Sequence, residues 1–388
     1  MENLVYVDRR GTNSVKWDGM TNMFGEEGLH AMWVADMDFQ VPACVKEALH
    51  KYVEEGVYGY FNVPDSYYQS FINWEEKRHG MKVEKDWLRF SPGVVSAFNW
   101  IVQMMSQPGD AVIVTTPVYY PFMYAVTGNE RKLITSDLKN DNGTYSIDFE
   151  DFEQKIIDNN VAMFILCSPH NPVGRVWTKE ELERLFEICR KHNVFVISDE
   201  IHHDLVSEGH KHLPSYTIGD YSDMMIAVTA PSKTFNLAGG QNSVVMIPNE
   251  ELRKKWDDFV LRIRVDRGNP FGYIAAEAAY TGGEAWLEEV SKQIAENDKY
   301  VRETFASELP EVVVSPLEGT YLSWIDLGAY VSVDEMKDFM QKKCRVAVDY
   351  GDWFGGERFG THIRMNLATT LENVKIGVES IIREIKNK

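Results

Sequence analysis

The chain has 388 residues, 44% of them hydrophobic and 26% charged, a composition typical of a large globular enzyme with more than one domain. Its formal net charge of -19 disfavours binding to nucleic acid or to anionic lipid, because both require a basic protein surface. We therefore expect a small-molecule partner, with no nucleic acid and no membrane.

The first forty or so residues form an irregular arm by pattern, and Pro42 stands where it can begin a helix. Between roughly residues 90 and 250, apolar runs of strand length alternate with helical patterns, which is typical of a parallel sheet wrapped by helices. The alternation is expected to hold throughout this region, and its clearest strands are 111–114, 162–166, 194–197 and 225–228.

Two helices between these strands are indicated by their own residues. Apolar side chains recur at three- and four-residue spacing from Val95 to Met105 and predict a helix that ends before Pro108. Thr178 and Glu181 form a capping box that predicts the start of another helix.

Beyond about residue 250 the pattern changes to long amphipathic helices, a strand at 320–326, a glycine-rich loop at 351–360 and a last helix rich in Lys and Glu. This mixture predicts a smaller α+β domain, which the N-terminal arm helps to complete. We expect a large domain of residues 46–284, and a small domain made of residues 1–45 and 285–388.

Cysteine and histidine spacing predicts no metal site. His202 and His203 are adjacent, so they point in different directions, and neither belongs to a metal-ligand motif. The four cysteines form no CxxC pair and suggest no disulfide framework: Cys44, Cys167, Cys189 and Cys344.

The first ten residues lack the apolar core of a signal peptide, and no apolar run reaches the roughly twenty residues that span a bilayer. These features predict a cytoplasmic protein.

Chemically useful residues follow the four clearest strands. The ligand sites of open parallel sheets lie at the carboxyl ends of the strands. The residues there are Tyr119 with Tyr120, then Asn171, then Asp199, and finally Lys233. We expect an aromatic face, an amide, a carboxylate and a lysine to converge at this edge.

Each of these residues also has an ordinary explanation. Lys233 is unusual at the end of a buried strand, where an amine loses hydration, but it could be a loop lysine whose ammonium reaches solvent. Asn171 could be a turn residue, Asp199 a helix cap and Tyr119 a packing residue. The order of the set favours a common function, because four coincidences at four successive strand ends are improbable.

The set suits a pyridoxal phosphate cofactor. A lysine forms a Schiff base, a carboxylate keeps the pyridine nitrogen protonated, an amide donates to the ring oxygen and an aromatic ring stacks on the cofactor. The helix that follows Gly93 would hold the phosphate through its free backbone N–H groups and its dipole.

The motifs around these residues resemble fold-type I pyridoxal-phosphate enzymes of the class I/II aminotransferase superfamily, and within it the carbon–sulfur lyases of the cystathionine β-lyase group. The most specific motifs lie at 167–177 and 229–239, and the likeness extends from 14–18 and 33–39 to 364–368. The resemblance implies an α/β fold with a mostly parallel seven-stranded sheet in the large domain. It also implies a homodimer with a shared active site.

Carried over by position, the resemblance implies three catalytic residues: Lys233 as the Schiff-base lysine, Asp199 as the partner of the pyridine nitrogen, and Tyr119 as the stacking ring. It implies a larger set that binds the cofactor, with Tyr60 lent by the neighbouring subunit: Gly93, Val94, Val95, Tyr119, Asn171, Asp199, His202, Ser232, Lys233 and Tyr60. It implies that substrate is bound by Arg364, which takes the α-carboxylate, by Tyr120 and by Ala35.

The chain departs from the wider aminotransferase pattern near the cofactor phosphate. Ala230 stands where many aminotransferases have serine, and Gln241 where they often have an arginine. Gly239 adds an extra glycine, and His202 replaces the tyrosine that contacts the ring oxygen in aspartate aminotransferases.

The function implied by the resemblance is α,β-elimination from L-cystathionine or a related cysteine S-conjugate, which yields a thiol such as homocysteine, pyruvate and ammonia. Two alternatives stay open at this point. One is an aminotransferase with the same active-site residues, and the other is a lyase that also has a regulatory binding role.

Overall fold

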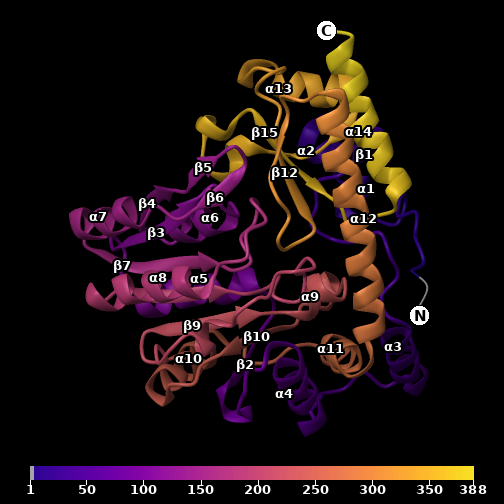
Figure 1. The fold of residues 1–388 in the computed structure, drawn as a ribbon. Coiled ribbons are helices and arrows are strands. Elements are labelled where there is room, and N and C mark those ends of the chain that lie inside the picture. The colour runs from indigo at the N-terminus through magenta and orange to yellow at the C-terminus, as the bar shows by residue number, and fades with distance from the viewer. Residues whose placement is uncertain (1–3) are drawn as a thin grey trace.

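The structure, a computed structural model, describes residues 4–388 and is centred on a seven-stranded sheet (Figure 1). Strand β10 runs antiparallel to β2 and β9, and the other neighbouring pairs are parallel. The fold class expected from the sequence is confirmed. In order across the sheet the strands are β2 (Leu88–Ser91), β10 (Ser243–Met246), β9 (Met225–Thr229), β8 (Phe195–Asp199), β7 (Val161–Cys167), β3 (Ala111–Thr116) and β4 (Lys132–Asp137).

The helices indicated by the sequence are present at the expected positions. Helix α5 (Val94–Met105) ends before Pro108, and the capping box of Thr178 with Glu181 begins α8 (Lys179–Lys191). The other helices around the large sheet are α3 (Ala43–Glu55), α4 (Asp65–His79), α6 (Pro121–Gly128), α7 (Phe149–Asn159), α10 (Glu250–Ile263) and α11 (Pro270–Gly282).

The expected alternation of strand and helix is wrong after β8. A loop with one 3-10 turn (Ser215–Thr217) connects β8 to β9, and the four-residue helix α9 (Pro231–Thr234) with a 3-10 turn (Ala238–Gly240) connects β9 to β10. Buried side chains replace helical hydrogen bonds in the loop, where Glu200 accepts from Ser198 Oγ at 2.9 Å and from the backbone N–H of Ser215 at 3.0 Å. The pattern of apolar residues does not report such side-chain hydrogen bonds.

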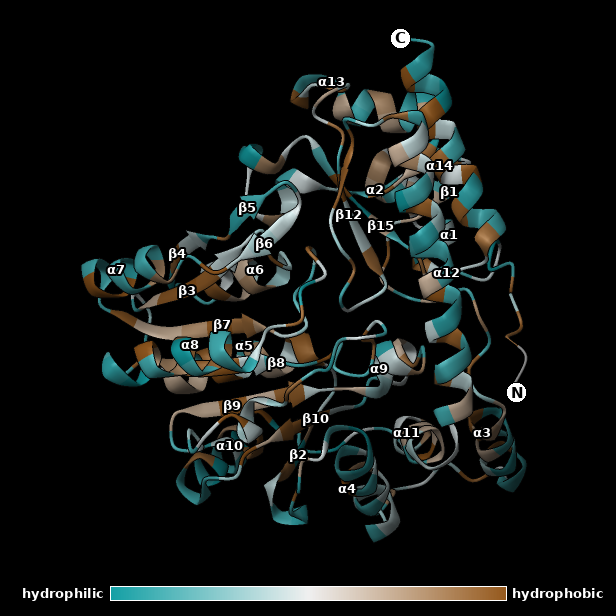
Figure 2. Cartoon of the chain, viewed as in Figure 1, coloured by the Kyte–Doolittle hydropathy of each residue, from teal (hydrophilic) through white to brown (hydrophobic). Residues whose placement is uncertain are grey.

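The sheet buries side chains on both faces. Val112 and Val114 of β3 pack with α5, α6 and α10, whereas Ala111 and Ile113 pack with α7 and α8. Successive side chains of a strand point to opposite faces, so a strand covered on both sides is apolar at every position. Figure 2 shows the strands of this sheet in brown between helices with teal outer faces.

A second, four-stranded antiparallel sheet contains β11 (Val313–Val314), β12 (Leu322–Asp326), β15 (His362–Asn366) and β14 (Asp349–Tyr350). The helices beside it are α12 (Glu284–Glu308), α13 (Val333–Asp338) and α14 (Leu371–Lys386), together with a π-helical turn (Phe339–Cys344). One apolar cluster joins residues of both sheets, so the boundaries expected at residues 45 and 284 stay a prediction. Within residues 4–388, no helix combines the length and the apolar character needed to cross a membrane.

The N-terminal arm is more regular than its sequence indicates. It contains α1 (Val15–Asp18), α2 (Met20–Phe24) and β1 (His30–Ala31), and β1 pairs in parallel with β13 (Val346–Ala347). A short hairpin of β5 (Lys139–Asp141) and β6 (Thr144–Ser146) lies after the edge strand β4.

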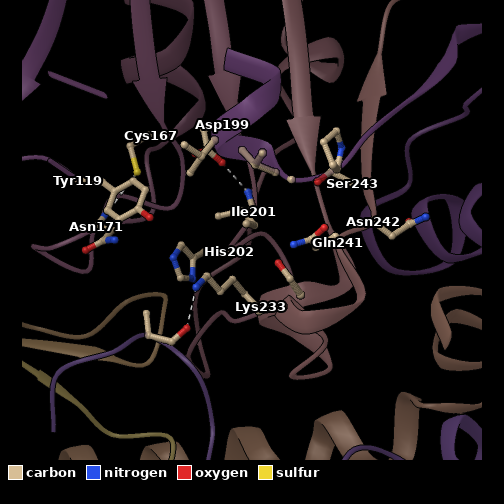
Figure 3. Close-up of a pocket in the computed structure, with 17 residues that line it drawn as sticks. Tyr119, Cys167, Asn171, Asp199, Ile201, His202, Lys233, Gln241, Asn242 and Ser243 are labelled. Carbon is tan, nitrogen blue, oxygen red and sulfur yellow. Dashed lines mark hydrogen bonds between the residues drawn. The ribbon is translucent and has the colours of Figure 1, made fainter. Parts of the chain in front are cut away.

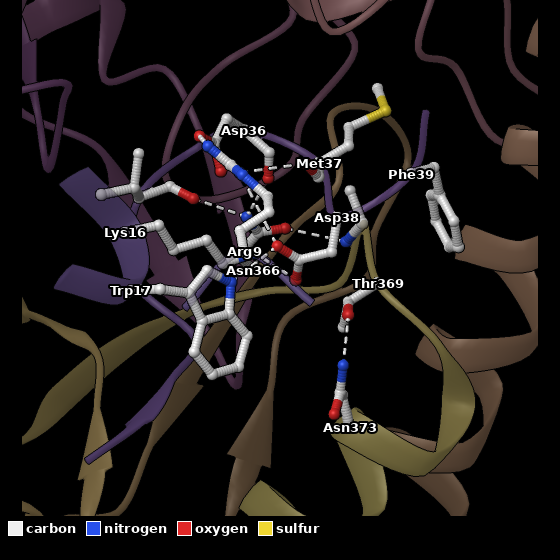
Figure 4. A network of polar contacts seen from close by, with 12 residues as sticks. Arg9, Lys16, Trp17, Asp36, Met37, Asp38, Phe39, Asn366, Thr369 and Asn373 are labelled. Carbon is white, nitrogen blue, oxygen red and sulfur yellow. Dashed lines mark hydrogen bonds and ion pairs between the residues drawn. The ribbon is translucent and has the colours of Figure 1, made fainter. Parts of the chain in front are cut away.

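A fully buried ion pair fixes the arm (Figure 4). Lys16 Nζ lies 2.7 Å from Asp38 Oδ2, and both side chains are 0% exposed. Trp17 Nε1 donates to Asp38 Oδ1 at 2.9 Å, and Trp33 Nε1 donates to the Lys16 carbonyl at 2.8 Å. Because a buried ion is tolerated only when it is paired, these contacts hold residues 33–38 in one position.

We expect Lys16→Ala to leave Asp38 buried with a distant partner and to lower the free energy of unfolding by about 3–5 kcal/mol. Urea unfolding followed by circular dichroism measures this change. Lys179→Ala removes a surface ion pair with Glu183 and is the matched control, for which a much smaller change is expected. Equal unfolding midpoints for Lys16→Ala and the wild type would contradict the prediction.

Candidate active site

A cavity of about 180 Å³ lies at the carboxyl ends of the parallel strands. Figure 3 shows Tyr119, His202, Lys233 and Gln241 around a common space, with Asp199 at its far side. The cavity is lined by Ala35, Pro92, Gly93, Val94, Val95, Tyr119, Cys167, Asn171, Asp199, Ile201, His202, Ser232, Lys233, Ala238, Gln241, Asn242 and Ser243. The structure therefore brings together ten of the residues singled out from the sequence, Ala35 among them.

Lys233 is half-buried just after β9. Pro231 begins the short helix α9 and directs Lys233 into the cavity, where Nζ donates to the Ala35 carbonyl at 2.6 Å. Burial lowers the pKa of Lys233 to about 8, although the charge of Asp36 opposes the shift. A lowered pKa makes the neutral, nucleophilic amine available near neutral pH, which favours a functional role over the alternative of an ordinary loop lysine.

Asp199 ends β8 and is 3% exposed. Burial raises the pKa of its carboxyl group to about 7. The backbone N–H of Ile201, which donates to Oδ1 at 3.0 Å, acts in the opposite direction and lowers this pKa. A cationic partner in the cavity would favour the ionised carboxylate. His202 also lines the cavity. Burial lowers the pKa of this histidine well below its usual value, so its ring is neutral.

The start of α5 presents unsatisfied donors to the cavity. Gly93 precedes the helix and provides no side-chain cap, so the N–H groups of the first turn have no partner within the helix. Ser243 Oγ and His202 Nδ1 are also buried without a hydrogen-bond partner. Backbone donors, a helix dipole and free hydroxyl groups form an environment that suits an anion such as phosphate.

Arg364 lies behind the cavity wall, on β15. Its guanidinium donates to Asn171 Oδ1 at 3.0 Å, to the Trp33 carbonyl at 3.2 Å and to Asp349 Oδ2. These bonds use three of the five N–H groups of an arginine, and the buried Nε has no partner. The side chain is thus held rigidly while two donors remain for an anionic ligand that reaches Asn171.

Three residues expected at the site do not line the cavity of this chain. Arg364 contacts it through Asn171, and the half-buried Tyr120 lies against Tyr119 with ring centroids 5.6 Å apart. Tyr60 is fully exposed, at 105% relative accessibility, and lies outside the cavity.

Sequence reasoning missed several residues of the site. Asn242 and Ser243 line the cavity from the start of β10, which is antiparallel, whereas the sequence pattern directed attention to the ends of parallel strands. Asp349 was missed because it meets Arg364 across the β14–β15 pair, where the two residues are in register. Asn242 and Ser243 could have been found from the sequence, since this polar pair comes soon after Lys233. No sequence signal indicated that Asp349 pairs with Arg364.

The donor set fits pyridoxal phosphate. The cavity combines an amine of lowered pKa, a carboxylate that favours a cationic partner, an aromatic ring and an anion-binding helix start. The buried, unpartnered atoms of His202 and Ser243 supply further positions for hydrogen bonds to a polar ligand.

The chain matches the family described as aminotransferase class I and II over residues 34–381. Cystathionine beta-lyase PatB of Bacillus subtilis (strain 168) is 40% identical over 378 residues, which cover 96% of this chain and 97% of PatB. The structure of cystalysin from Treponema denticola, which contains a pyridoxal 5'-phosphate cofactor, has a TM-score of 0.95 and 36% identity, covering 99% of this chain and 98% of cystalysin. A PLP-bound putative aminotransferase from Clostridium difficile 630 has a TM-score of 0.95 and 41% identity, covering 98% of each chain.

Proposed function

This chain belongs to the aminotransferase class I and II family, and we propose that within it the protein is a pyridoxal-phosphate-dependent carbon–sulfur β-lyase. The substrate is L-cystathionine or a related cysteine S-conjugate. Together with water, α,β-elimination converts it into a thiol, pyruvate and ammonia, and the thiol is homocysteine when cystathionine is the substrate.

The observation that supports this proposal most strongly is the position of Lys233 and Asp199. Asp199 ends β8, Lys233 follows the adjacent parallel strand β9, and both line one cavity. Burial shifts the pKa of each group toward neutrality, to about 8 for Lys233 and to about 7 for Asp199. Ionisable groups with pKa values near the working pH are suited to proton transfer.

We assign the cofactor to residues of the cavity wall. Lys233 would hold its aldehyde group, Asp199 its pyridine nitrogen, and Tyr119 the face of its ring. Asn171 and His202 would contact the ring oxygen. The N–H groups of the turn at Gly93, Val94 and Val95, together with the hydroxyl of Ser232, would bind the phosphate. When bound, pyridoxal phosphate supplies an electron sink that stabilises negative charge at the substrate Cα.

The chain's own residues then position the substrate and move its proton. Arg364, held by Asp349 and Asn171, offers its uncommitted N–H groups to the α-carboxylate. Ala35 lines the cavity, and Tyr120 lies behind the ring of Tyr119. Lys233 Nζ accepts the proton from Cα as a neutral amine, which its lowered pKa permits. Loss of that proton allows the Cβ–S bond to break, and the sulfur leaves with the bonding electrons.

An aminotransferase is the second candidate, because a solved structure with 41% identity is titled a putative aminotransferase. The two reactions share the removal of the Cα proton and differ in the steps after it. A lyase releases pyruvate from cystathionine without a second substrate, whereas an aminotransferase requires a 2-oxo acid to accept the amino group.

We expect the purified holoenzyme to release pyruvate from cystathionine without an added 2-oxo acid, and Lys233→Ala to lower that rate at least about a thousandfold through loss of the general base. A coupled lactate dehydrogenase assay measures the pyruvate. Lys255→Ala, at an exposed position of α10, is the control and should retain the wild-type rate. Turnover that depends on a 2-oxo acid would identify an aminotransferase, and near wild-type elimination by Lys233→Ala would refute the assigned role of Lys233.

Arg364→Lys keeps the positive charge but loses the planar fork that binds a carboxylate through two parallel hydrogen bonds. We expect kcat/KM to fall roughly a hundredfold while the cofactor stays bound. Steady-state kinetics and the visible absorbance of the cofactor measure the two properties. Arg358→Lys, which changes a surface ion pair with Asp137, is the matched control. Loss of cofactor from Arg364→Lys would instead place this residue at the cofactor.

The proposal includes a homodimer in which Tyr60 enters the partner's active site. Val57, Tyr58 and Tyr60 form an exposed apolar segment, at 75%, 55% and 105% relative accessibility, and Phe271 lies beside Tyr58 with ring centroids 5.6 Å apart. A chain that stayed monomeric would leave this apolar surface in water. We also propose a cytoplasmic location, since the buried Cys167, Cys189 and Cys344 form no disulfide.

We expect the wild type to sediment as a dimer and Tyr60→Phe to release the cofactor about ten- to hundredfold faster, because one hydrogen bond to a charged group is lost. Gel filtration followed by absorbance of the retained cofactor measures the release. The control is Tyr300→Phe. Tyr300 lies on α12, and its hydroxyl donates to Glu379 at 3.1 Å. An active monomer, or unchanged cofactor retention in Tyr60→Phe, would disprove the shared site.

A further inference from the structure

A second group of ionisable side chains lies outside the active-site cavity, between α4 and the loop after β8. It consists of Glu75 and His79, one turn apart on α4, and of His203 and Asp204 in the loop. Glu75, His203 and Asp204 are 1%, 2% and 4% exposed, and the His79 side chain is 7% exposed. One donor atom from each of Glu75, His79 and His203 lies within 4.8 Å of the others.

The ring of His203 is oriented so that Nε2 faces two carboxylates. Its Nδ1 lies 2.7 Å from both the carbonyl oxygen of Glu200 and Thr229 Oγ1, and when Nδ1 donates to the carbonyl, a neutral ring leaves Nε2 as an acceptor. Nε2 then lies 3.2 Å from Glu75 Oε1 and 3.2 Å from Asp204 Oδ2. Neither His203 Nε2 nor Glu75 Oε1 has a hydrogen-bond partner, although both atoms are buried. A neutral imidazole nitrogen among carboxylate oxygens requires a cation at this point.

A proton on Nε2 is one such cation. Burial acts to lower the pKa of His203, but the charges of Asp204 and Glu75 outweigh it and raise that pKa to about 10. Asp204 already has donors of its own, because Arg78 Nε lies 3.4 Å and His79 Nε2 lies 2.9 Å from its Oδ1. Glu75 Oε1, by contrast, is buried without a hydrogen-bond partner and lies 3.2 Å from His203 Nε2. Three convergent ligand atoms, from Glu75, His79 and His203, suit a divalent ion that keeps a fourth position for water.

We propose that Glu75, His79 and His203 bind a divalent transition-metal ion of the Zn²⁺ class, with the carboxylate of Asp204 beside them. Bonds of 2.0–2.2 Å in a tetrahedron place neighbouring ligand atoms about 3.3 Å apart. His203 Nε2 lies 3.2 Å from Glu75 Oε1, and one ligand atom from each of the three residues lies within 4.8 Å of the others. Small shifts of these side chains therefore reach the spacing that the ion requires.

The surroundings of the four residues support the same assignment. Metal-binding histidines usually donate their second ring N–H to a carbonyl or carboxylate, as His203 Nδ1 does to Glu200. The carboxylate of Asp204 accepts from Trp74 Nε1 at 3.0 Å and from Thr234 Oγ1 at 2.8 Å, which fixes its orientation. A cavity of about 330 Å³, which Asp204 and Arg78 help to line, lies next to the group.

The ion would connect α4 to the wall of the active site. His203 follows His202 of the cavity lining, and Asp204 holds Thr234, the neighbour of Lys233. Binding would therefore stabilise the elements that carry the site without contact with the reacting groups. The metal site would serve this purpose whichever reaction the enzyme catalyses.

The proposal is tested by calorimetry. The untagged holoenzyme is first treated with a chelator and is then titrated with Zn²⁺. We expect one Zn²⁺ per chain and a higher thermal unfolding midpoint in its presence. Glu75→Gln keeps the shape of the side chain but loses a charged ligand, so its affinity should fall by more than the roughly 10- to 100-fold that loss of an outer-shell partner costs. His192→Gln changes a histidine 2.8 Å from a carboxylate oxygen of Glu153 outside the cluster, and it should bind Zn²⁺ as the wild type does.

Absence of Zn²⁺ binding by the wild type would overturn the proposal in favour of a protonated His203. Equal affinities for Glu75→Gln and the wild type would overturn it as well. Should Glu75→Gln fail to fold, anomalous scattering at the zinc edge from wild-type crystals soaked in Zn²⁺ decides the question. A peak among the four side chains supports the site, and a peak elsewhere or none refutes it.

Discussion

The partial burial of one amine, that of Lys233, is the constraint on which the arrangement of the site depends. A charged lysine at the end of a buried strand is costly, and the cost appears as a pKa lowered to about 8. Nζ donates to the carbonyl of Ala35, which also accepts from the hydroxyl of Tyr321 at 2.8 Å. The N-terminal arm must therefore reach across the molecule to the end of β9, and the contacts that hold the arm also hold the active site.

Two asparagines make that crossing possible. Asn236, three residues after Lys233 and in a left-handed conformation (φ 58°), exchanges hydrogen bonds with the backbone of Met37. Asn366, two residues after Arg364, donates to the carbonyls of Val34 and Asp36 at 2.5 and 2.6 Å. The same short segment thus ties the lysine of the large sheet to the arginine of the small one, so the two groups are positioned relative to each other by backbone contacts.

The sequence predicted the parts of this arrangement that depend on the topology of the sheet. Tyr119, Asn171, Asp199 and Lys233 share a cavity because parallel strands end at the same edge, which strand patterns alone can indicate. The pairing of Arg364 with Asp349 depends on the register of two antiparallel strands, and register is set by turns and packing that apolar patterns do not specify. The motif resemblance to the class I/II aminotransferase superfamily is confirmed by the family match over residues 34–381.

The segment after β8 shows why the simple alternation of strand and helix failed at this point. Asp199 and His202 line the active-site cavity, whereas Glu200, His203 and Asp204 make buried polar contacts outside it. A helix would satisfy its own backbone groups, whereas an irregular loop needs other partners for them, and Glu200 supplies one by accepting from the backbone N–H of Ser215. The side chain of Asp204 accepts from Thr234 and so links the loop to the short helix that carries Lys233. The loop thus places a group of buried charges close to the active-site cavity.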